Sequence, residues 1–281
     1  MMEAYTSFAK VYDVFMDETP YEEWVERIRD AIETYGVSRP KEEQQTDTSK
    51  NYSAGDEEMV NALASERDLV LDLGCGTGNM TERLAAFGYD MIGVDCAEEM
   101  LSIAMEKREE SGSQILYLLQ DMRELELYST VGTVVSVCDS LNYLLEEEEL
   151  LQTFQRVDNY LYPGGIFVFD FNTVYKYAQV IGDTTIAENR EDCSFIWENF
   201  YHPKEEINEY DLTLFVQEKE GLYRKFTETH YQRGYTLEQM QRIAGQAGLK
   251  WVCARDADTG GAVTPQTERI FAVVKEQKKQ I

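Results

Sequence analysis

The stretch that most constrains the fold of this 281-residue chain is Leu69 to Gly78, LVLDLGCGTG. Its first five residues form a short apolar run closed by glycines, which is typical of a buried β-strand and too brief for a helix. Gly74, Gly76 and Gly78 let the backbone turn sharply and approach a ligand that side chains there would block. Because Asn79 to Ala86 is helix-forming, we predict a strand, a glycine turn and a helix whose first N–H groups point at a bound polar molecule.

The spacing of these glycines distinguishes between classes of nucleotide-binding protein. A dinucleotide fingerprint requires G-x-G-x-x-G, but counting from Gly74 the last position is Asn79, and counting from Gly76 it is Thr81. The spacing is instead G-x-G-x-G, preceded by Asp72. In this motif the chain resembles the class I S-adenosylmethionine-dependent methyltransferases, whose first motif reads much like LDLGCGTG. A nucleotide fold without catalysis, or a tight structural turn, is the alternative interpretation.

Strand-like runs alternate with helical stretches from Asp68 onward, a pattern that predicts a parallel sheet covered by helices on both faces. Two further strands near the end of the chain would complete a Rossmann-like, doubly wound α/β fold with a mostly parallel seven-stranded sheet. Ligands bind such sheets at the carboxyl ends of the strands. The predicted strands are Leu69 to Leu73, Met91 to Val94, Ile115 to Leu119, Thr133 to Cys138, Ile166 to Phe171, Trp251 to Arg255 and Arg269 to Lys275.

Two flanking blocks have a different character. Tyr5 to Tyr35 carries aromatic and apolar residues at helical spacing with a break at Pro20, which predicts a helical lid. Aromatic-rich strands at Ser194 to Tyr201, Tyr210 to Glu218 and Tyr223 to Tyr231 predict an antiparallel block that lies over the site or mediates homodimerisation. We therefore divide the chain into a lid at 1–66 with a polar insertion at 39–55, a core at 67–180, an antiparallel insertion at 181–235, and a C-terminal helix and strands at 236–281.

Composition excludes several classes of partner. Lys and Arg number 26 against 53 Asp and Glu, a formal net charge of -27, so the surface repels phosphate backbones and non-specific nucleic-acid binding is not expected. The sequence shows neither a signal-peptide pattern nor a transmembrane span, and we expect a cytoplasmic protein without a membrane partner. Five scattered cysteines argue against a disulfide framework, and two histidines make a zinc site hard to assemble.

Acidic and apolar residues at the strand ends are candidates for holding the cofactor. Asp95 ends the second strand at a spacing from the glycines at which carboxylates bind ribose hydroxyls, although it could instead cap the helix that follows. The resemblance implies that Asp121 and Met122 contact adenine, and that Cys138 and Leu141 border the methionyl part. For the neighbouring Asp139 and Asn142, closing a turn is the structural alternative. The predicted cofactor-binding residues are Asp72, Gly74, Cys75, Gly76, Gly78, Asp95, Cys96, Met100, Asp121, Met122, Cys138, Leu141, Tyr12 and Trp24.

The catalytic candidates come mainly from the antiparallel block. In ETHYQRGY, strand alternation puts Glu228 and His230 on one face, where His230 could take a proton from the acceptor and Arg233 could bind an acceptor carboxylate or phosphate. A hydrogen-bonded structural histidine is the alternative. Asp139 leaves the fourth strand toward cofactor or acceptor, and the ring of Tyr12 could stabilise the sulfonium cation, unless Tyr12 is a core residue. The predicted catalytic residues are His230, Asp139, Arg233 and Tyr12, with no metal.

The resemblance implies transfer of a methyl group from S-adenosyl-L-methionine to an amine or hydroxyl of a small molecule by in-line displacement, which leaves S-adenosyl-L-homocysteine. The resemblance is greatest to bacterial small-molecule methyltransferases of the methyltransferase domain 25 type, and it extends to TPQTERIFAVVK near the end of the chain. The alternatives are an NAD(P)-dependent oxidoreductase and a noncatalytic cofactor-binding scaffold, and the charge opposes an RNA-directed enzyme. The identity of the acceptor is not encoded in any motif.

Overall fold

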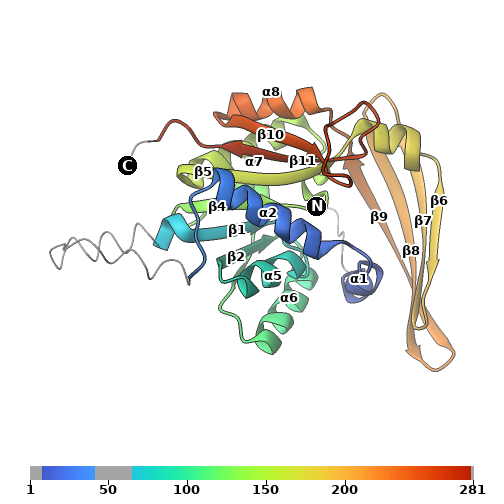
Figure 1. Cartoon of the computed structure of the whole chain (residues 1–281). Helices are drawn as coiled ribbons and strands as arrows, with labels where there is room; N and C mark the ends of the chain where they lie inside the picture. The colour runs from blue at the N-terminus through green and yellow to red at the C-terminus, as the bar shows by residue number, and fades with distance from the viewer. Residues whose placement is uncertain (1–7, 42–64, 280–281) are drawn as a thin grey trace.

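The computed structural model describes residues 8–41 and 65–279, and within them the chain forms two sheets with helices around the larger one (Figure 1). The helices are α1 (Ala9–Phe15), α2 (Tyr21–Tyr35), α5 (Asn79–Ala86), α6 (Glu98–Ser111), α7 (Glu147–Tyr160) and α8 (Leu237–Ala247), with short turns of helix at η1 (Met122–Glu124), η2 (Ser140–Tyr143) and η3 (Lys176–Ile181). The strands are β1 (Leu69–Leu73), β2 (Asp90–Asp95), β3 (Leu116–Leu119), β4 (Val131–Ser136), β5 (Leu161–Asn172), β6 (Thr185–Asn189), β7 (Cys193–His202), β8 (Ile207–Lys219), β9 (Leu222–Arg233), β10 (Lys250–Asp256) and β11 (Arg269–Lys275).

The larger sheet of the described residues has seven strands in the order β10-β11-β5-β4-β1-β2-β3. The five strands from β5 to β3 in this order run parallel, whereas β11 is antiparallel to both β5 and β10. The predicted Rossmann-like, mostly parallel sheet is therefore confirmed. Because β1 lies between β2 and β4, the turn after β1 opens between the carboxyl ends of its two neighbours.

A separate apolar core fills each face of this sheet. On one face α7 and α8 pack against β4, β5 and β11 around the fully buried Phe154, Phe169 and Ile243. On the other face α2, α5 and α6 cover β1 and β2 through Ile28 and Leu84, which are also fully buried (Figure 1). Apolar residues on both faces explain why the parallel strands read as continuous hydrophobic runs.

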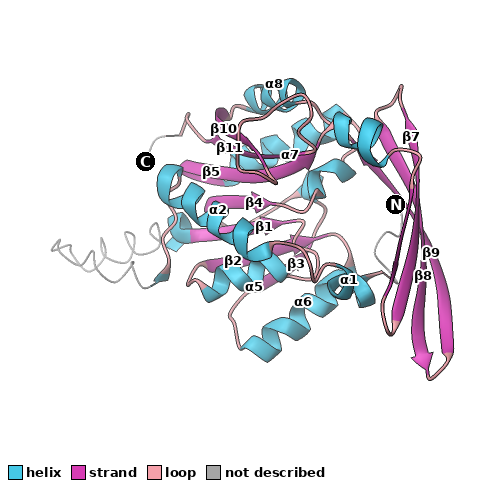
Figure 2. Cartoon of the chain, turned by 45° about the vertical axis from the view of Figure 1, so that its right-hand side comes forward, coloured by secondary structure: helices cyan, strands magenta, loops and turns pink. Residues whose placement is uncertain are grey.

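The second sheet is antiparallel, with strand order β6-β7-β8-β9, and it stands beyond the carboxyl ends of the parallel strands (Figure 2). Helix α1 lies against its inner face, where Val11 packs among Phe195, Leu212 and Leu214. The other side of α1 meets α6 through Ala9 and Met100. The antiparallel block predicted from the sequence is confirmed, and α1 fills the space between it and the core.

Two local predictions differ from the structure. Strand β5 begins at Leu161, earlier than the predicted strand Ile166 to Phe171. Leu161 pairs with Val131 and the next ladder partner is Ile166, so the residues between them, including Pro163 and Gly164, bulge out of the sheet. Proline lacks the N–H that a ladder needs, and Gly164 has φ +74°, so this segment cannot pair regularly. Strand β6 was not predicted, because its residues are mostly exposed and lack an apolar alternation.

The N-terminal prediction is tested in part. The two helices and the break at Pro20 are present as α1 and α2. Most of the predicted polar insertion at 39–55 lies outside the described residues. No helix in the described parts of the chain is both long and apolar enough to cross a membrane.

Candidate functional site

The three glycines after β1 adopt left-handed backbone angles for different physical reasons. Gly74, Gly76 and Gly78 have φ of +80°, +54° and +77°. A Cβ at Gly74 would lie 2.7 Å from the side chain of Ser140, and one at Gly78 would lie 2.5 Å from the hydroxyl of Tyr117. A Cβ at Gly76 would meet no atom within 4 Å. The turn is therefore packed against protein at its two ends and open at its middle residue.

Hydrogen bonds tie this turn to the neighbouring strand. The N–H groups of Gly74 and Cys75 both donate to the carbonyl of Val94, at 2.7 and 3.0 Å. Asp95 follows directly, and its Oδ2 accepts the N–H of Gly76 at 2.8 Å while its Oδ1 accepts the N–H of Ala97 at 2.8 Å. The surrounding protein raises the pKa of Asp95 by desolvation, and these N–H groups lower it. Because each carboxylate oxygen has a second lone pair, Asp95 can hold the backbone near the start of α6 and still accept hydroxyl donors.

Asp72 lies beneath the same turn and is only 1% exposed. Its Oδ2 accepts a hydrogen bond from the hydroxyl of Thr81 at 2.6 Å. Burial raises the pKa of Asp72 to about 7, the Thr81 hydrogen bond lowers it, and the nearby Asp95 raises it further. A buried carboxyl of this kind is poised to ionise when a positive group binds beside it.

A cavity of about 1010 Å³ opens over these residues at the carboxyl ends of β1, β2 and β4. It extends from the glycine turn to the inner face of β9, so that the larger sheet and the antiparallel sheet both contribute to its walls. Most of the predicted site residues line it: Asp72, Gly74, Cys75, Gly76, Asp95, Cys96, Met100, Asp121, Met122, Cys138, Tyr12 and His230.

The acidic residue after β3 is already paired. The carboxylate of Asp121 accepts the N–H of Arg123 at 2.9 Å and forms an ion pair with its guanidinium at 2.5 Å. These bonds to Arg123 lower the pKa of Asp121. Arg123 also pairs with Glu149, so this edge of the cavity is charged. Asp121 holds its loop in place there and also lines the cavity.

Five predicted site residues lie outside the described lining of the cavity. Gly78 packs against Tyr117 at the start of α5, and Leu141 is fully buried in the core. The ring of Trp24 lies 5.3 Å from the guanidinium carbon of Arg269. The last two are Asp139, which pairs with Arg269 at 2.7 Å, and Arg233, which donates to the carbonyl of Leu145 and pairs with Glu206 at 3.5 Å.

A partly buried ionic cluster lies behind the cavity wall at the end of β4. Cys138 and Asp139 have left-handed angles, φ +60° and +54°, which are strained for residues with side chains. The carboxylate of Asp170 accepts both of their N–H groups, at 3.1 and 2.8 Å, and Arg269 bridges it to Asp139. Burial raises the pKa of Asp170, whereas Arg269 lowers it. This cluster holds the backbone of the wall in its strained form.

The wall opposite the glycine turn is aromatic. The hydroxyl of Tyr143, on η2, is 2.7 Å from the hydroxyl of Tyr210 and 3.1 Å from Nδ1 of His230. The rings of Tyr210 and His230 are stacked, with centroids 4.9 Å apart and planes inclined by 6°. The importance of Tyr210 was missed from the sequence, because only the register that pairs it with His230 across β8 and β9 brings the two rings together.

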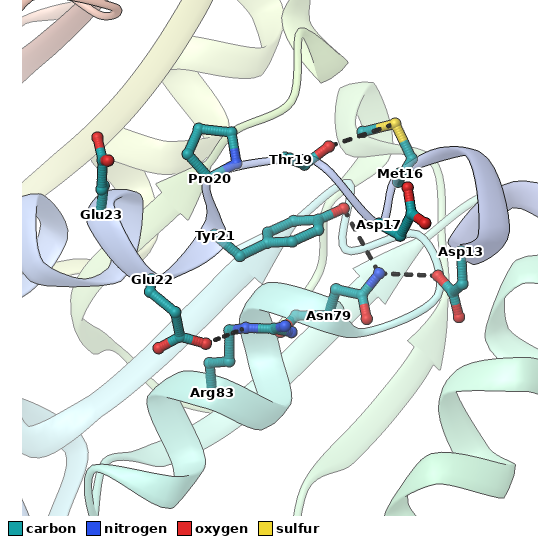
Figure 3. A pocket seen from close by; sticks show the side chains of 10 residues that line it. All are labelled: Asp13, Met16, Asp17, Thr19, Pro20, Tyr21, Glu22, Glu23, Asn79 and Arg83. Atoms are coloured by element: carbon teal, nitrogen blue, oxygen red, sulfur yellow. Dashed lines mark hydrogen bonds and ion pairs between the residues drawn. The ribbon is translucent and has the colours of Figure 1, made fainter.

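Helix α1 is attached to the glycine turn by a polar contact that the sequence did not indicate. Oδ1 of Asp13 accepts hydrogen bonds from Thr77 and Asn79, each at 2.7 Å, and Oδ2 pairs with Lys107 at 2.6 Å. Figure 3 shows Asn79 between Asp13 and the hydroxyl of Tyr21, beside a smaller hollow of about 350 Å³. Asn79 and Tyr21 line both spaces, so α1 and the start of α2 cover one end of the cavity.

Comparisons with known proteins agree on one family. A family model described as "Methyltransferase domain" matches residues 70–165. The chain is 34% identical over 277 residues to "Putative methyltransferase YqeM" of Bacillus subtilis, covering 98% of each chain. A protein of Geobacillus sp. (strain WCH70) with the same kind of description is 34% identical over 271 residues, 96% of this chain and 99% of the relative.

A solved structure extends this similarity to the fold. It is a S-adenosylmethionine-dependent methyltransferase from Clostridium acetobutylicum, 27% identical, with a TM-score of 0.79 over 98% of this chain and 99% of that chain. The match includes both sheets, because so little of either chain lies outside it.

Replacing Asp170 with asparagine tests the ionic cluster. Asp170→Asn removes the buried negative partner of Arg269 while Asp139 remains, so we expect a loss of about 1–3 kcal/mol in the free energy of unfolding. Urea denaturation measures this loss. Asp258→Asn, at an exposed loop position, is the matched control and should change stability by less than about 0.5 kcal/mol. Equal stability of the two variants would contradict the role given to Asp170.

Proposed function

The chain belongs to the class I S-adenosylmethionine-dependent methyltransferases, and on that premise we propose that it methylates an amine or a hydroxyl group of a small-molecule acceptor. The observation that carries this proposal is the single cavity of about 1010 Å³ that joins the glycine turn to the Tyr143 and His230 wall. Small-molecule sites are commonly of about this size and lie at strand ends of α/β sheets. Membership of this family also decides against the NAD(P)-dependent oxidoreductase.

The residues around the glycine turn fit S-adenosylmethionine in charge and shape. The open space against Gly76 admits a ligand next to the backbone, and Asp95 has lone pairs for the two ribose hydroxyls. Asp72 offers a buried carboxyl to the ammonium group of the methionyl part, and Met122 offers an apolar surface to the adenine. When bound there, the cofactor supplies a methyl group on a sulfonium.

The far end of the cavity is suited to the acceptor. Tyr12, Tyr143 and His230 line it, and α1 covers it from the side of the glycine turn. Enclosure of this kind excludes water and aligns an acceptor with the methyl group, which are the main contributions a protein makes to an in-line displacement. We propose that Tyr12 faces the sulfonium and that His230 receives the acceptor proton. Asp139, which pairs with Arg269, and Arg233, which pairs with Glu206, would act by holding the wall of the cavity in position.

Named relatives support both kinds of acceptor atom. A sugar N,N-dimethyltransferase of Streptomyces venezuelae is 29% identical over 124 residues, and a ubiquinone biosynthesis O-methyltransferase of Ruegeria sp. (strain TM1040) is 31% identical over 91 residues. Both act on small molecules by their names. The net charge of -27 makes a polyanionic acceptor such as RNA unfavourable.

The ribose role of Asp95 predicts a loss of cofactor affinity on truncation. Asp95→Ala removes a charged hydrogen-bond partner, and we expect binding of S-adenosylhomocysteine to weaken by about 2 kcal/mol, roughly 30-fold. Isothermal titration calorimetry measures this, with Asp258→Asn as a control that should bind like the wild type. Undiminished affinity in a folded Asp95→Ala protein would remove Asp95 from the ribose site.

The buried Asp72 predicts a pH-dependent affinity. In the free protein burial raises its pKa to about 7, so below that pH the carboxyl is mostly protonated. An ammonium group bound beside it favours the ionised form and expels the proton. Affinity for S-adenosylhomocysteine should therefore increase by up to about tenfold per pH unit from pH 5 to 7 and then level off. Calorimetry in buffers of different ionisation enthalpy should detect the released proton, and Asp72→Asn should abolish the dependence.

A screen of amine, hydroxyl and carboxylate metabolites with methyl-labelled cofactor tests the proposed activity. If the proposal is right, a small molecule acquires label and His230→Ala lowers the turnover of that acceptor by roughly 100-fold or more, with cofactor affinity nearly unchanged. Cofactor binding without labelling of any acceptor would instead favour the noncatalytic scaffold. Wild-type turnover in His230→Ala would end the assignment of His230 as the base.

A further inference from the structure

Three polar side chains on the acceptor wall form a continuous chain that leads from buried protein to the cavity. Oε2 of Glu228 is 3.4 Å from Nε2 of His230, and Nδ1 of the same ring is 3.1 Å from the hydroxyl of Tyr143. The side chains of Glu228 and His230 are 4% and 0% exposed. Tyr143 is half-buried and lines the cavity, and it is the most exposed of the three residues.

The contacts of Glu228 determine which histidine nitrogen carries the proton. Oε1 of Glu228 accepts the backbone N–H of Phe8 at 3.0 Å, which leaves Oε2 directed at the imidazole. A carboxylate oxygen next to a ring nitrogen favours an N–H at that nitrogen, so the proton of neutral His230 belongs on Nε2. Nδ1 then has a lone pair and accepts the hydroxyl proton of Tyr143.

Tyr210 completes the arrangement around Tyr143. Its hydroxyl, 2.7 Å away, can donate to the Tyr143 oxygen, which is an acceptor when its own proton points to His230. The Tyr210 ring, stacked on His230, also prevents the imidazole from rotating. Donation then runs in one direction, from the Tyr210 hydroxyl to Tyr143 and from Tyr143 to Nδ1 of His230, while Nε2 of His230 meets Glu228 as a charge contact at 3.4 Å and makes no hydrogen bond within the described residues.

We propose that Tyr143 is the catalytic residue that contacts the acceptor, and that Glu228 is a positioning residue that keeps Nδ1 of His230 ready to take the Tyr143 proton. The proposal rests on the proposed methyltransferase function and deepens it. His230 receives the proton through Tyr143, whose hydroxyl is 3.1 Å from Nδ1, and both residues line the cavity.

The acceptor reacts through an O–H or N–H group. The acceptor oxygen or nitrogen forms a bond to the methyl carbon, the carbon–sulfur bond breaks, and its electron pair stays on sulfur to give the neutral thioether. The acceptor proton passes to the Tyr143 oxygen as the Tyr143 proton passes to Nδ1 of His230. The product imidazolium, with a proton on each nitrogen, is stabilised by the Glu228 carboxylate.

Nitrogen-15 NMR of labelled histidine tests the orientation of this chain without an acceptor. The protein has two histidines, so His202→Gln identifies the signals of His230 directly. At about pH 8.5, where histidine side chains are ordinarily neutral, we expect His230 to be the Nε2–H tautomer in the complex with S-adenosylhomocysteine. An Nδ1–H tautomer in the wild-type protein would overturn the proposal.

The isosteric change Glu228→Gln should reverse the tautomer. The Phe8 N–H keeps the amide oxygen on its side, so the amide NH2 faces Nε2 and donates to it, and the ring proton moves to Nδ1. Tyr143 can then no longer donate to His230. Glu218→Gln, at an exposed ion pair with Arg224, is the matched control and should leave the His230 spectrum unchanged. A wild-type tautomer in Glu228→Gln would contradict the positioning role.

Kinetics with the acceptor found in the screen test the catalytic role. Tyr143→Phe should lower kcat by roughly 100-fold or more and change the KM for S-adenosylmethionine by less than about threefold. Glu228→Gln should lower kcat similarly, whereas Tyr223→Phe, far along the hairpin, should behave like the wild type. Wild-type kcat in Tyr143→Phe would overturn the proposal. If no acceptor is methylated, the proposed function fails, and the tautomer measurements still decide the direction of the chain.

Discussion

The hydrogen bonds from Gly74 and Cys75 to the carbonyl of Val94 are the contacts on which the site depends. They join the turn after β1 to the end of β2, and the residue after Val94 is Asp95, whose carboxylate accepts the N–H of Gly76. One small network thus sets the shape of the glycine turn, the position of the ribose-binding candidate and the start of α6. Gly74 and Gly76 donate from left-handed backbone conformations, which favour glycine. A Cβ at Gly74 would also lie 2.7 Å from the side chain of Ser140, so a larger residue there would disturb the whole network.

The antiparallel sheet encloses the cavity over the glycine turn and Asp95. Its strand β9 alternates inward and outward residues, so Glu228, His230 and Gln232 all face the core and are at least 92% buried. Helix α1 fills the remaining gap, and Asp13 attaches it to Thr77 and Lys107 beside the turn. The wall is supported from behind by the Asp170 and Arg269 cluster, which compensates the strain of Cys138 and Asp139. Polar groups on the wall are therefore held by other buried groups, as an aligned reaction requires.

Sequence patterns were sufficient where a signal is local. The strand at Leu69 to Leu73 and the helix at Asn79 to Ala86 begin and end as predicted, because apolar periodicity and glycines act within a few positions. The same reasoning placed the start of β5 too late, because the turn-forming residues Pro163 to Gly165 form a bulge inside the strand. Trp24 and Leu141 were predicted for the cofactor site from the resemblance, but in the structure they pack beside Arg269 and in the core.

The sequence by itself determined the glycine turn, the alternation of strands and helices, and the acidic residue at the end of β2, because each depends on residue types at short fixed spacings. It also determined the family, through a motif that differs from a dinucleotide fingerprint by the position of one glycine. Only the tertiary structure decided which side chains meet across the cavity. The contacts between Tyr143 and His230, 87 residues apart, and between Phe8 and Glu228, 220 residues apart, depend on strand register and on the packing of α1, which no local pattern encodes.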